Sequence, residues 1–125
     1  MIEKPRILIV DDEQNIRLLV RKFLTDKFTV LEAIDGEEAV EMARKHRPSL
    51  ILMDILMPKM GGYDACSMIK NDQSTKRIPV FMLTGLGFEL NKKFAEAVGA
   101  DGYITKPFTS EQLLDTIGKF LKIPN

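Results

Sequence analysis

Apolar and polar positions along this chain follow two patterns that take turns from one end to the other. Short, nearly continuous apolar runs are typical of strands buried on both faces of a parallel sheet, and apolar residues that recur every three or four positions are typical of amphipathic helices. The runs predict strands at 6–10, 29–33, 50–53, 79–83 and 102–105. A helical pattern follows each of them, at 16–24, from 35, at 62–70, at 89–98 and at 109–121.

This alternation restricts the fold class. Parallel strands joined by helices have right-handed crossovers, which place helices on both faces of the sheet. A closed barrel of eight such units would need about twice the length of this 125-residue chain. We therefore predict one α/β domain with a doubly wound, five-stranded parallel sheet in the order 2-1-3-4-5. In that order, the ligand crevice lies at the carboxyl ends of the first and third strands.

Three helix ends carry capping residues. Asp35 precedes Glu38 by three positions, and Thr109 precedes Gln112 by three positions. Both spacings predict helix starts, because the first side chain can accept a hydrogen bond from the third amide of the helix. Gly99 predicts the end of the helix at 89–98, since glycine readily adopts the left-handed conformation.

Composition and charge exclude several classes of function. Lys plus Arg and Asp plus Glu both number 18, so there is no overall basic field for nucleic acid or an anionic membrane. No apolar stretch approaches the roughly 18 residues of a membrane span, and residues 1–5 do not resemble a signal peptide. The single cysteine, Cys66, excludes an internal disulfide and fits a reducing compartment. We expect a cytoplasmic protein that binds neither nucleic acid nor membrane directly.

The candidate chemistry lies just after the strands. Because the carboxyl ends of parallel strands share one edge of the sheet, polar residues that follow different strands are expected to meet there. In chain order these residues are Asp11 and Asp12 after the first strand, Asp54 after the third, Thr84 and Gly85 after the fourth, and Lys106 after the fifth.

Asp54 directly follows a buried apolar strand, where an unpaired carboxylate would be costly. Together with Asp11 and Asp12 it would form a cluster in which each acid raises the pKa of the others unless a cation is shared. Because the cluster offers only oxygen ligands, it favours a hard ion such as Mg²⁺.

Four segments carry a family resemblance. They are Asp11-Asp12, Asp54-Ile-Leu-Met-Pro-Lys-Met-Gly-Gly62, Thr84-Gly85 and Tyr103-Ile-Thr-Lys-Pro-Phe108. In this order, each at a predicted strand end, they resemble the receiver domain of two-component response regulators. The resemblance covers essentially the whole chain. It implies one receiver domain over residues 1–125, with a core at about 5–122 and a flavodoxin-like fold.

The resemblance implies that Asp54 is the phosphoacceptor. It would take a phosphoryl group from a phosphohistidine of a sensor histidine kinase or a phosphotransfer domain, or from a small donor such as acetyl phosphate. It further implies that Asp11, Asp12, Asp54 and the backbone carbonyl of Leu56 bind Mg²⁺, with Mn²⁺ as an alternative ion. Such a domain catalyses its own phosphorylation and dephosphorylation.

The other site residues have implied roles as well. Lys106, the Thr84 hydroxyl and the Gly85 amide would contact phosphoryl oxygens, and the peptide bond from Lys106 to Pro107 would be cis. Thr84 would move on phosphorylation, Tyr103 would rotate into the space it leaves, and the surface of the fourth helix, fifth strand and fifth helix would change. The output would be a change in binding to a downstream partner, by a monomer or a phosphorylation-dependent dimer.

Two leucines depart from the commonest polar choices in the family. Leu56 and Leu86 lie two residues beyond Asp54 and Thr84, respectively, and would flank the path of the hydrolytic water. We therefore expect slow autodephosphorylation.

Each motif taken alone also has a simpler interpretation. The Asp11-Asp12 pair is also what a helix cap requires, and Thr84 is also a suitable last residue of a strand. Lys106 is also compatible with a solvated lysine before a proline. Tyr103 is compatible with either a buried anchor or a moving switch.

Other functional classes are also open. A haloacid-dehalogenase-type phosphatase would require a second acid two residues after Asp54, where this chain has Leu56. A flavodoxin-like cofactor carrier would require a phosphate-binding loop where Asp11 and Asp12 stand. A receiver cut from a longer regulator or hybrid kinase, and a phosphorylation-independent scaffold, both keep the same fold.

Overall fold

The computed structural model describes residues 3–85 and 92–124, and its centre is a five-stranded parallel sheet. The strands are β1 (Arg6–Val10), β2 (Thr29–Ala33), β3 (Leu50–Asp54), β4 (Val80–Thr84) and β5 (Gly102–Thr105). They pair in parallel in the order β2-β1-β3-β4-β5, which confirms the predicted doubly wound sheet.

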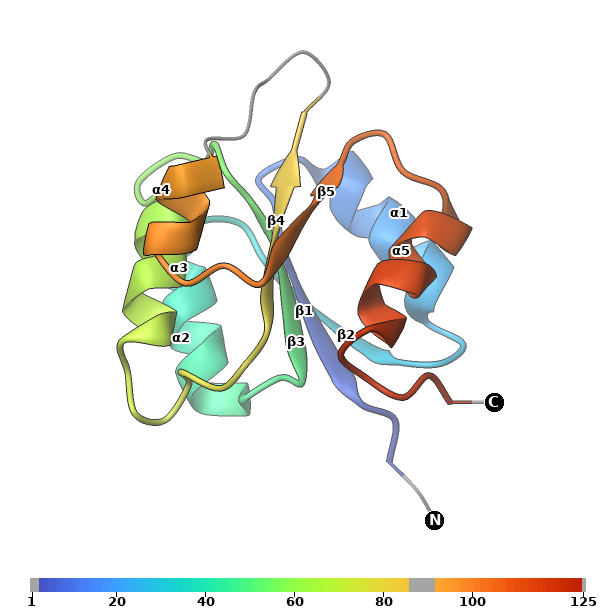
Figure 1. The fold of residues 1–125 in the computed structure, drawn as a ribbon. Helices are drawn as coiled ribbons and strands as arrows, with labels where there is room; N and C mark the ends of the chain where they lie inside the picture. The colour runs from blue at the N-terminus through green and yellow to red at the C-terminus, as the bar shows by residue number, and fades with distance from the viewer. Residues whose placement is uncertain (1–2, 86–91, 125) are drawn as a thin grey trace.

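Helices cover both faces of this sheet (Figure 1). They are α1 (Gln14–Leu24), α2 (Gly36–His46), α3 (Gly62–Lys70), α4 (Lys92–Ala97) and α5 (Ser110–Gly118). Helices α1 and α5 lie on one face, and α2, α3 and α4 lie on the other. None of the helices in the described parts of the chain has the length and apolar character needed to cross a membrane.

Alternate residues of the inner strands point to opposite faces of the sheet. On β1, Ile7 and Ile9 pack into the core beneath α1 and α5, while Leu8 and Val10 pack into the core beneath α2 and α3. All four side chains are fully buried. An inner strand therefore needs apolar residues at consecutive positions, which is why these strands appear as continuous runs in the sequence. The edge strands β2 and β5 are partly exposed and have a more mixed pattern.

Strands β3 and β4 each extend one residue further than predicted. Asp54 still pairs with Leu83, and Thr84 pairs with Thr105, so both candidate site residues are the last residues of their strands. Strand pairing therefore fixes the backbone of both residues, and the site begins on the sheet itself.

Several predicted helix bounds differ in the structure: α1 begins at Gln14 instead of residue 16, for example. The last helix ends at Gly118 instead of continuing to Leu121, and the chain then turns tightly as the amides of Phe120 and Leu121 bond to the carbonyl of Ile117. Phe120 is 45% exposed, but its ring still packs edge-to-face on the buried ring of Phe81, with 4.9 Å between the centroids. The predicted start of the fourth helix at residue 89 lies outside the described residues.

The predicted helix ends are confirmed. The Asp35 carboxylate accepts a hydrogen bond from the Glu38 amide at 2.8 Å. Thr109 and Gln112 form both arms of a capping box, at 3.1 and 2.9 Å. Gly99 has a φ of +88°, the left-handed conformation expected after a helix.

Candidate functional site

Three acidic side chains meet at the carboxyl edge of β1 and β3. Asp11, Asp12 and Asp54 each bring one carboxylate oxygen to within 4.8 Å of the others. Asp11 is fully buried, Asp12 is exposed and Asp54 is 8% exposed. The two strands are neighbours in the sheet, so the predicted convergence of these acids follows directly from the strand order.

Lys106 lies between two of these acids. Its Nζ is 2.8 Å from Oδ2 of Asp11 and 3.3 Å from Oδ1 of Asp54. The Lys106 amide donates to the Thr84 carbonyl at 2.7 Å, and the predicted cis peptide bond from Lys106 to Pro107 is present. The interpretation of Lys106 as a solvated lysine is therefore wrong.

Burial and charge repulsion perturb Asp54. Burial raises the pKa of its carboxyl, and the neighbouring charge of Asp11 raises it further, while Lys106 and the Ile55 amide lower it; the result is a pKa of about 6. The carboxylate is therefore mainly ionised at neutral pH, but its charge is poorly stabilised. An additional cation would relieve this cost.

Lys106 remains charged in the same surroundings. Burial lowers the pKa of its ammonium group, but the hydrogen bond to Asp11 and the charges of Asp11 and Asp54 outweigh burial and raise the pKa overall. The site therefore contains a fixed positive charge directly beside the Asp54 carboxylate.

The start of α1 shows that Asp11 and Asp12 are not its capping residues. The N-cap position belongs to Glu13, and the Asp11 carboxylate accepts a hydrogen bond from the Glu13 amide at 2.9 Å. The interpretation of the acidic pair as a simple helix cap is therefore wrong. The bond instead helps to hold the buried Asp11 side chain beside Lys106.

The loop after β3 folds back tightly over the end of its own strand. The Gly62 amide donates to the Ile55 carbonyl at 2.9 Å. A Cβ atom at Gly62 would lie 2.1 Å from the Asp54 carbonyl oxygen, so only glycine fits without a backbone shift. This close approach fixes the main chain on one side of the acidic cluster.

A crevice of about 300 Å³ opens over the cluster. Its lining residues are Asp12, Glu13, Asp54, Ile55, Leu56, Leu83, Gly85 and Lys106. Leu56 is 64% exposed, and an added Cβ at Gly85 would meet no atom within 4 Å. The crevice is thus open enough for a small anionic group. Leu86, the second apolar residue predicted beside the path of the hydrolytic water, lies outside the described residues.

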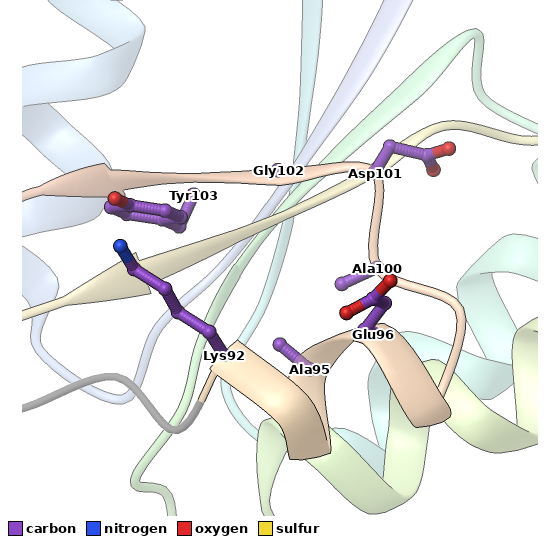
Figure 2. Close-up of a pocket in the computed structure, with 7 residues that line it drawn as sticks. All are labelled: Lys92, Ala95, Glu96, Ala100, Asp101, Gly102 and Tyr103. Atoms are coloured by element: carbon purple, nitrogen blue, oxygen red, sulfur yellow. The ribbon is translucent and has the colours of Figure 1, made fainter.

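Thr84 and Tyr103 lie on neighbouring strands. Thr84 is only 4% exposed, whereas Tyr103 is 46% exposed, so the interpretation of Tyr103 as a buried anchor is wrong. Figure 2 shows Lys92, at the start of α4, extending toward the Tyr103 ring, and its Nζ lies 5.8 Å from the ring centroid. The tyrosine therefore borders an open space between α4 and β5.

Sequence reasoning did not identify two residues at this edge. Glu13 lines the crevice, and Arg17 donates to the Asp11 carbonyl at 2.8 Å. The acidic run that includes Glu13 is visible in the sequence. The contact of Arg17 has no local sequence pattern, because it depends on how α1 packs against the sheet.

Comparison with known proteins decides between the open classes. A family model described as the response regulator receiver domain matches residues 7–118. This chain belongs to the response regulator receiver domain family. Receiver domains are components of two-component signalling. Because the match covers most of the chain, the phosphatase and cofactor-carrier alternatives are excluded as its family.

The relatives of this receiver domain include short and long proteins. It is 42% identical to chemotaxis protein CheY of Halobacterium salinarum, and the match covers 93% of this chain and 96% of that protein. It is 37% identical to probable transcriptional regulator ycf27 of Porphyra purpurea, over 96% of this chain but 49% of that protein. The chain thus spans about half the length of some curated relatives.

Solved structures agree with the fold. Chemotaxis protein CheY4 of Vibrio cholerae superposes with a TM-score of 0.88 at 36% identity, covering 94% of this chain and 99% of that one. The receiver domain of sensor histidine kinase PA1611 from Pseudomonas aeruginosa, whose structure has a magnesium ion in the active site cleft, superposes with a TM-score of 0.85. It is 26% identical and covers 94% of this chain and 97% of that one.

Proposed function

We propose that this receiver domain is a phosphorylation-activated switch in which Asp54 accepts the phosphoryl group. The donor is a phosphohistidine on a sensor histidine kinase or a phosphotransfer domain. The observation that carries the proposal is the place of the Asp54 carboxylate, at the end of β3 in an open crevice, with the Lys106 ammonium 3.3 Å away and two further acids beside it.

Asp54 takes the phosphoryl group by direct displacement of the donor imidazole. An oxygen of Asp54 attacks the phosphorus atom, and the bond from phosphorus to the donor imidazole breaks. The imidazole nitrogen keeps the bonding electrons and takes up a proton from water, and Asp54 becomes an acyl phosphate. Because phosphoryl transfer depends mainly on alignment and charge neutralisation, a fixed ammonium beside the nucleophile is suited to the reaction. The Thr84 hydroxyl and the Gly85 amide donate hydrogen bonds to the remaining phosphoryl oxygens.

The acidic cluster fits a hard divalent cation. The carboxylate oxygens of Asp11, Asp12 and Asp54 lie within 4.8 Å of one another, and oxygen atoms are the ligands that Mg²⁺ prefers. These residues and the carbonyl of Leu56 would hold Mg²⁺, or Mn²⁺ in its place. When bound, the ion supplies neutralisation of charge on the phosphoryl oxygens.

The output surface consists of α4, β5 and α5. Thr84 moves toward the phosphoryl group, and Tyr103 leaves its half-exposed position to occupy the space beside β4. Driving such an equilibrium from 1:99 to 99:1 requires about 5.5 kcal/mol. Two or three charge-assisted hydrogen bonds at roughly 1.5 to 3 kcal/mol each are sufficient. In the described part of α4 only Ala95 is buried, so this helix is weakly anchored and suited to shift.

Residues 1–125 form one receiver domain with a core at about 5–122, acting in the cytoplasm through protein partners and not through nucleic acid or membrane. It acts either alone, as a monomer or a phosphorylation-dependent dimer, or as the receiver module of a longer regulator or hybrid kinase. The similarity to both CheY and ycf27 is compatible with either arrangement.

Intact-protein mass spectrometry tests the phosphorylation. The wild type is incubated with acetyl phosphate and Mg²⁺, and then with a chelator in place of the ion. We expect one phosphoryl adduct that requires the divalent ion and is absent from Asp54→Asn. The matched control is Asp64→Asn, which changes an exposed acid in the first turn of α3 and should still be phosphorylated.

Two results would contradict the proposal. An adduct that persists in Asp54→Asn would place the phosphoryl group on another residue. If neither acetyl phosphate nor a panel of phosphorylated histidine donors produced an adduct, the domain would instead be a phosphorylation-independent scaffold.

A further inference from the structure

The main chain of Asp11 is held from both sides. Its amide donates to the Ala33 carbonyl of β2 at 3.1 Å, and its carbonyl accepts a hydrogen bond from Nη1 of Arg17 at 2.8 Å. The side chain is bound by Lys106 and by the Glu13 amide, as described above. Of these four partners, Arg17 is the one that connects the acidic turn to the body of helix α1.

A carboxylate on β2 holds Arg17 in place. Nε of Arg17 donates to Oε1 of Glu32 at 2.9 Å, and Arg21 donates to Oε2 of the same carboxylate at 2.7 and 3.0 Å. The Arg17 side chain is only 14% exposed. Although burial raises the pKa of Glu32, the hydrogen bonds from Arg21 and Arg17 lower it overall, so the carboxylate stays charged.

The guanidinium of Arg17 therefore joins two elements through different nitrogens. Nε is bound by Glu32 on β2, and Nη1 points to the carbonyl of Asp11 after β1. A guanidinium is planar and rigid, so fixing one nitrogen also fixes the direction of the other. A lysine at this position would keep the charge but could not reproduce two separate, fixed donors.

We propose that Arg17, held by Glu32, is a positioning residue that sets the divalent-cation affinity of the acidic cluster by fixing the Asp11 main chain. The proposal rests on the cation site of the proposed function. It adds the role of a residue that lies outside the crevice and touches neither the phosphoryl group nor the reacting atoms.

Charge and geometry predict opposite effects at this position. Arg17 is a cation near a cation site, so loss of its charge alone would strengthen the binding of Mg²⁺. Loss of positioning would weaken binding, because partners that orient metal ligands contribute about 10- to 100-fold to metal affinity. The sign of the effect therefore distinguishes the two mechanisms.

Arg21 provides a matched control. It binds the same carboxylate as Arg17, but its other contact is the Val30 carbonyl on β2 at 3.1 Å. Arg21→Lys weakens the same cluster with Glu32 without removing a bond to the acidic turn. A general loss of stability would therefore affect the Arg17 and Arg21 variants alike, and loss of positioning would affect only the former.

The experiment is a calorimetric titration of the apo domain with MgCl₂ for the wild type, Arg17→Lys, Arg17→Met and Arg21→Lys. Urea unfolding in the same buffer establishes the folded fraction of each variant. We expect both Arg17 variants to bind Mg²⁺ about tenfold more weakly than the wild type, the lower end of the range for such partners. Arg21→Lys should stay within about twofold.

Unchanged or tighter binding by Arg17→Met would overturn the positioning role, and so would equal weakening in the Arg17 and Arg21 variants. If the folded wild type itself failed to bind Mg²⁺, both the cation site of the proposed function and the positioning role of Arg17 would be refuted. If the wild type bound Mg²⁺ and both Arg17 variants bound it with the same affinity, only the positioning role of Arg17 would be refuted.

Discussion

Replacing Asp54 with asparagine is expected to stabilise the metal-free domain at neutral pH. Asp54 is only 8% exposed as a whole residue, and its carboxylate lies beside the buried charge of Asp11. Asparagine has nearly the same shape and keeps an oxygen that can accept a hydrogen bond from Lys106. The substitution therefore removes a poorly stabilised charge without opening a cavity.

The magnitude follows from the perturbed titration of Asp54. Its pKa is raised from 3.8 to about 6, which is about two units. Each unit corresponds to about 1.4 kcal/mol, so ionisation of this group at pH 7 costs the folded state about 3 kcal/mol relative to the unfolded chain. The favourable effect of Lys106 is already contained in this pKa, so the expected gain of Asp54→Asn in the free energy of unfolding at pH 7 is about 3 kcal/mol.

The pH dependence has a definite direction. Because the folded-state pKa of Asp54 lies above its unfolded value, the folded protein holds this proton more tightly than the unfolded chain. The contribution of Asp54 to stability is therefore most favourable below about pH 4 and is lost as pH rises through about 6. The advantage of Asp54→Asn should be full at pH 7 and shrink steadily toward pH 4.

Urea unfolding in the presence of a chelator, from pH 7.5 down to pH 4.5, measures this difference. Asp12→Asn removes an acid of the same cluster at an exposed position and should change stability by no more than about 0.5 kcal/mol. The reasoning would be refuted by an Asp54→Asn variant that is no more stable than the wild type at pH 7. A gain that stays constant over the whole pH range would refute it as well.

Two further substitutions test the walls of the crevice. Leu56→Asn should speed loss of the phosphoryl group about fivefold, since one hydrogen bond to the attacking water is worth about 1 kcal/mol. The decay of the phosphoprotein measures this rate, and equal rates in the wild type and the variant would contradict the prediction. Gly62→Ala should lower the free energy of unfolding by about 1 to 3 kcal/mol, because the new Cβ would lie 2.1 Å from the Asp54 carbonyl oxygen. Gly85→Ala adds a methyl group in open space and is the control for Gly62→Ala in urea unfolding. If both variants lost the same free energy of unfolding, steric conflict would not be the cause.

The carboxyl edge of the sheet shows how much can be predicted from local pattern. Residues of an inner strand must be apolar on both faces, so the end of each strand is marked by the first polar residue, as at Asp54 and Thr84. Once the strands are parallel, their carboxyl ends share one edge. The convergence of Asp11, Asp12 and Asp54 then follows from the strand order alone.

Side-chain exposure and helix ends were less predictable. Tyr103 is half exposed because β5 is an edge strand beside an open space, and its own sequence context is compatible with either a buried or an exposed ring. Arg47 ends α2 in the left-handed conformation, with a φ of 44°, at a position where glycine or asparagine would be the usual signal. Both outcomes depend on neighbouring elements and not on the local residues.

Apolar periodicity and strand ends are local properties of the chain, so the elements, the parallel sheet and the edge at which the acids gather can all be predicted from the residues. The atoms that meet at this edge are set by the packing of distant elements. Lys106 bridges to Asp11 across 95 positions of sequence, and Arg17 connects Glu32 to the Asp11 carbonyl. Such contacts depend on distances between packed helices and strands, to within a fraction of an ångström, and no local residue pattern specifies those distances.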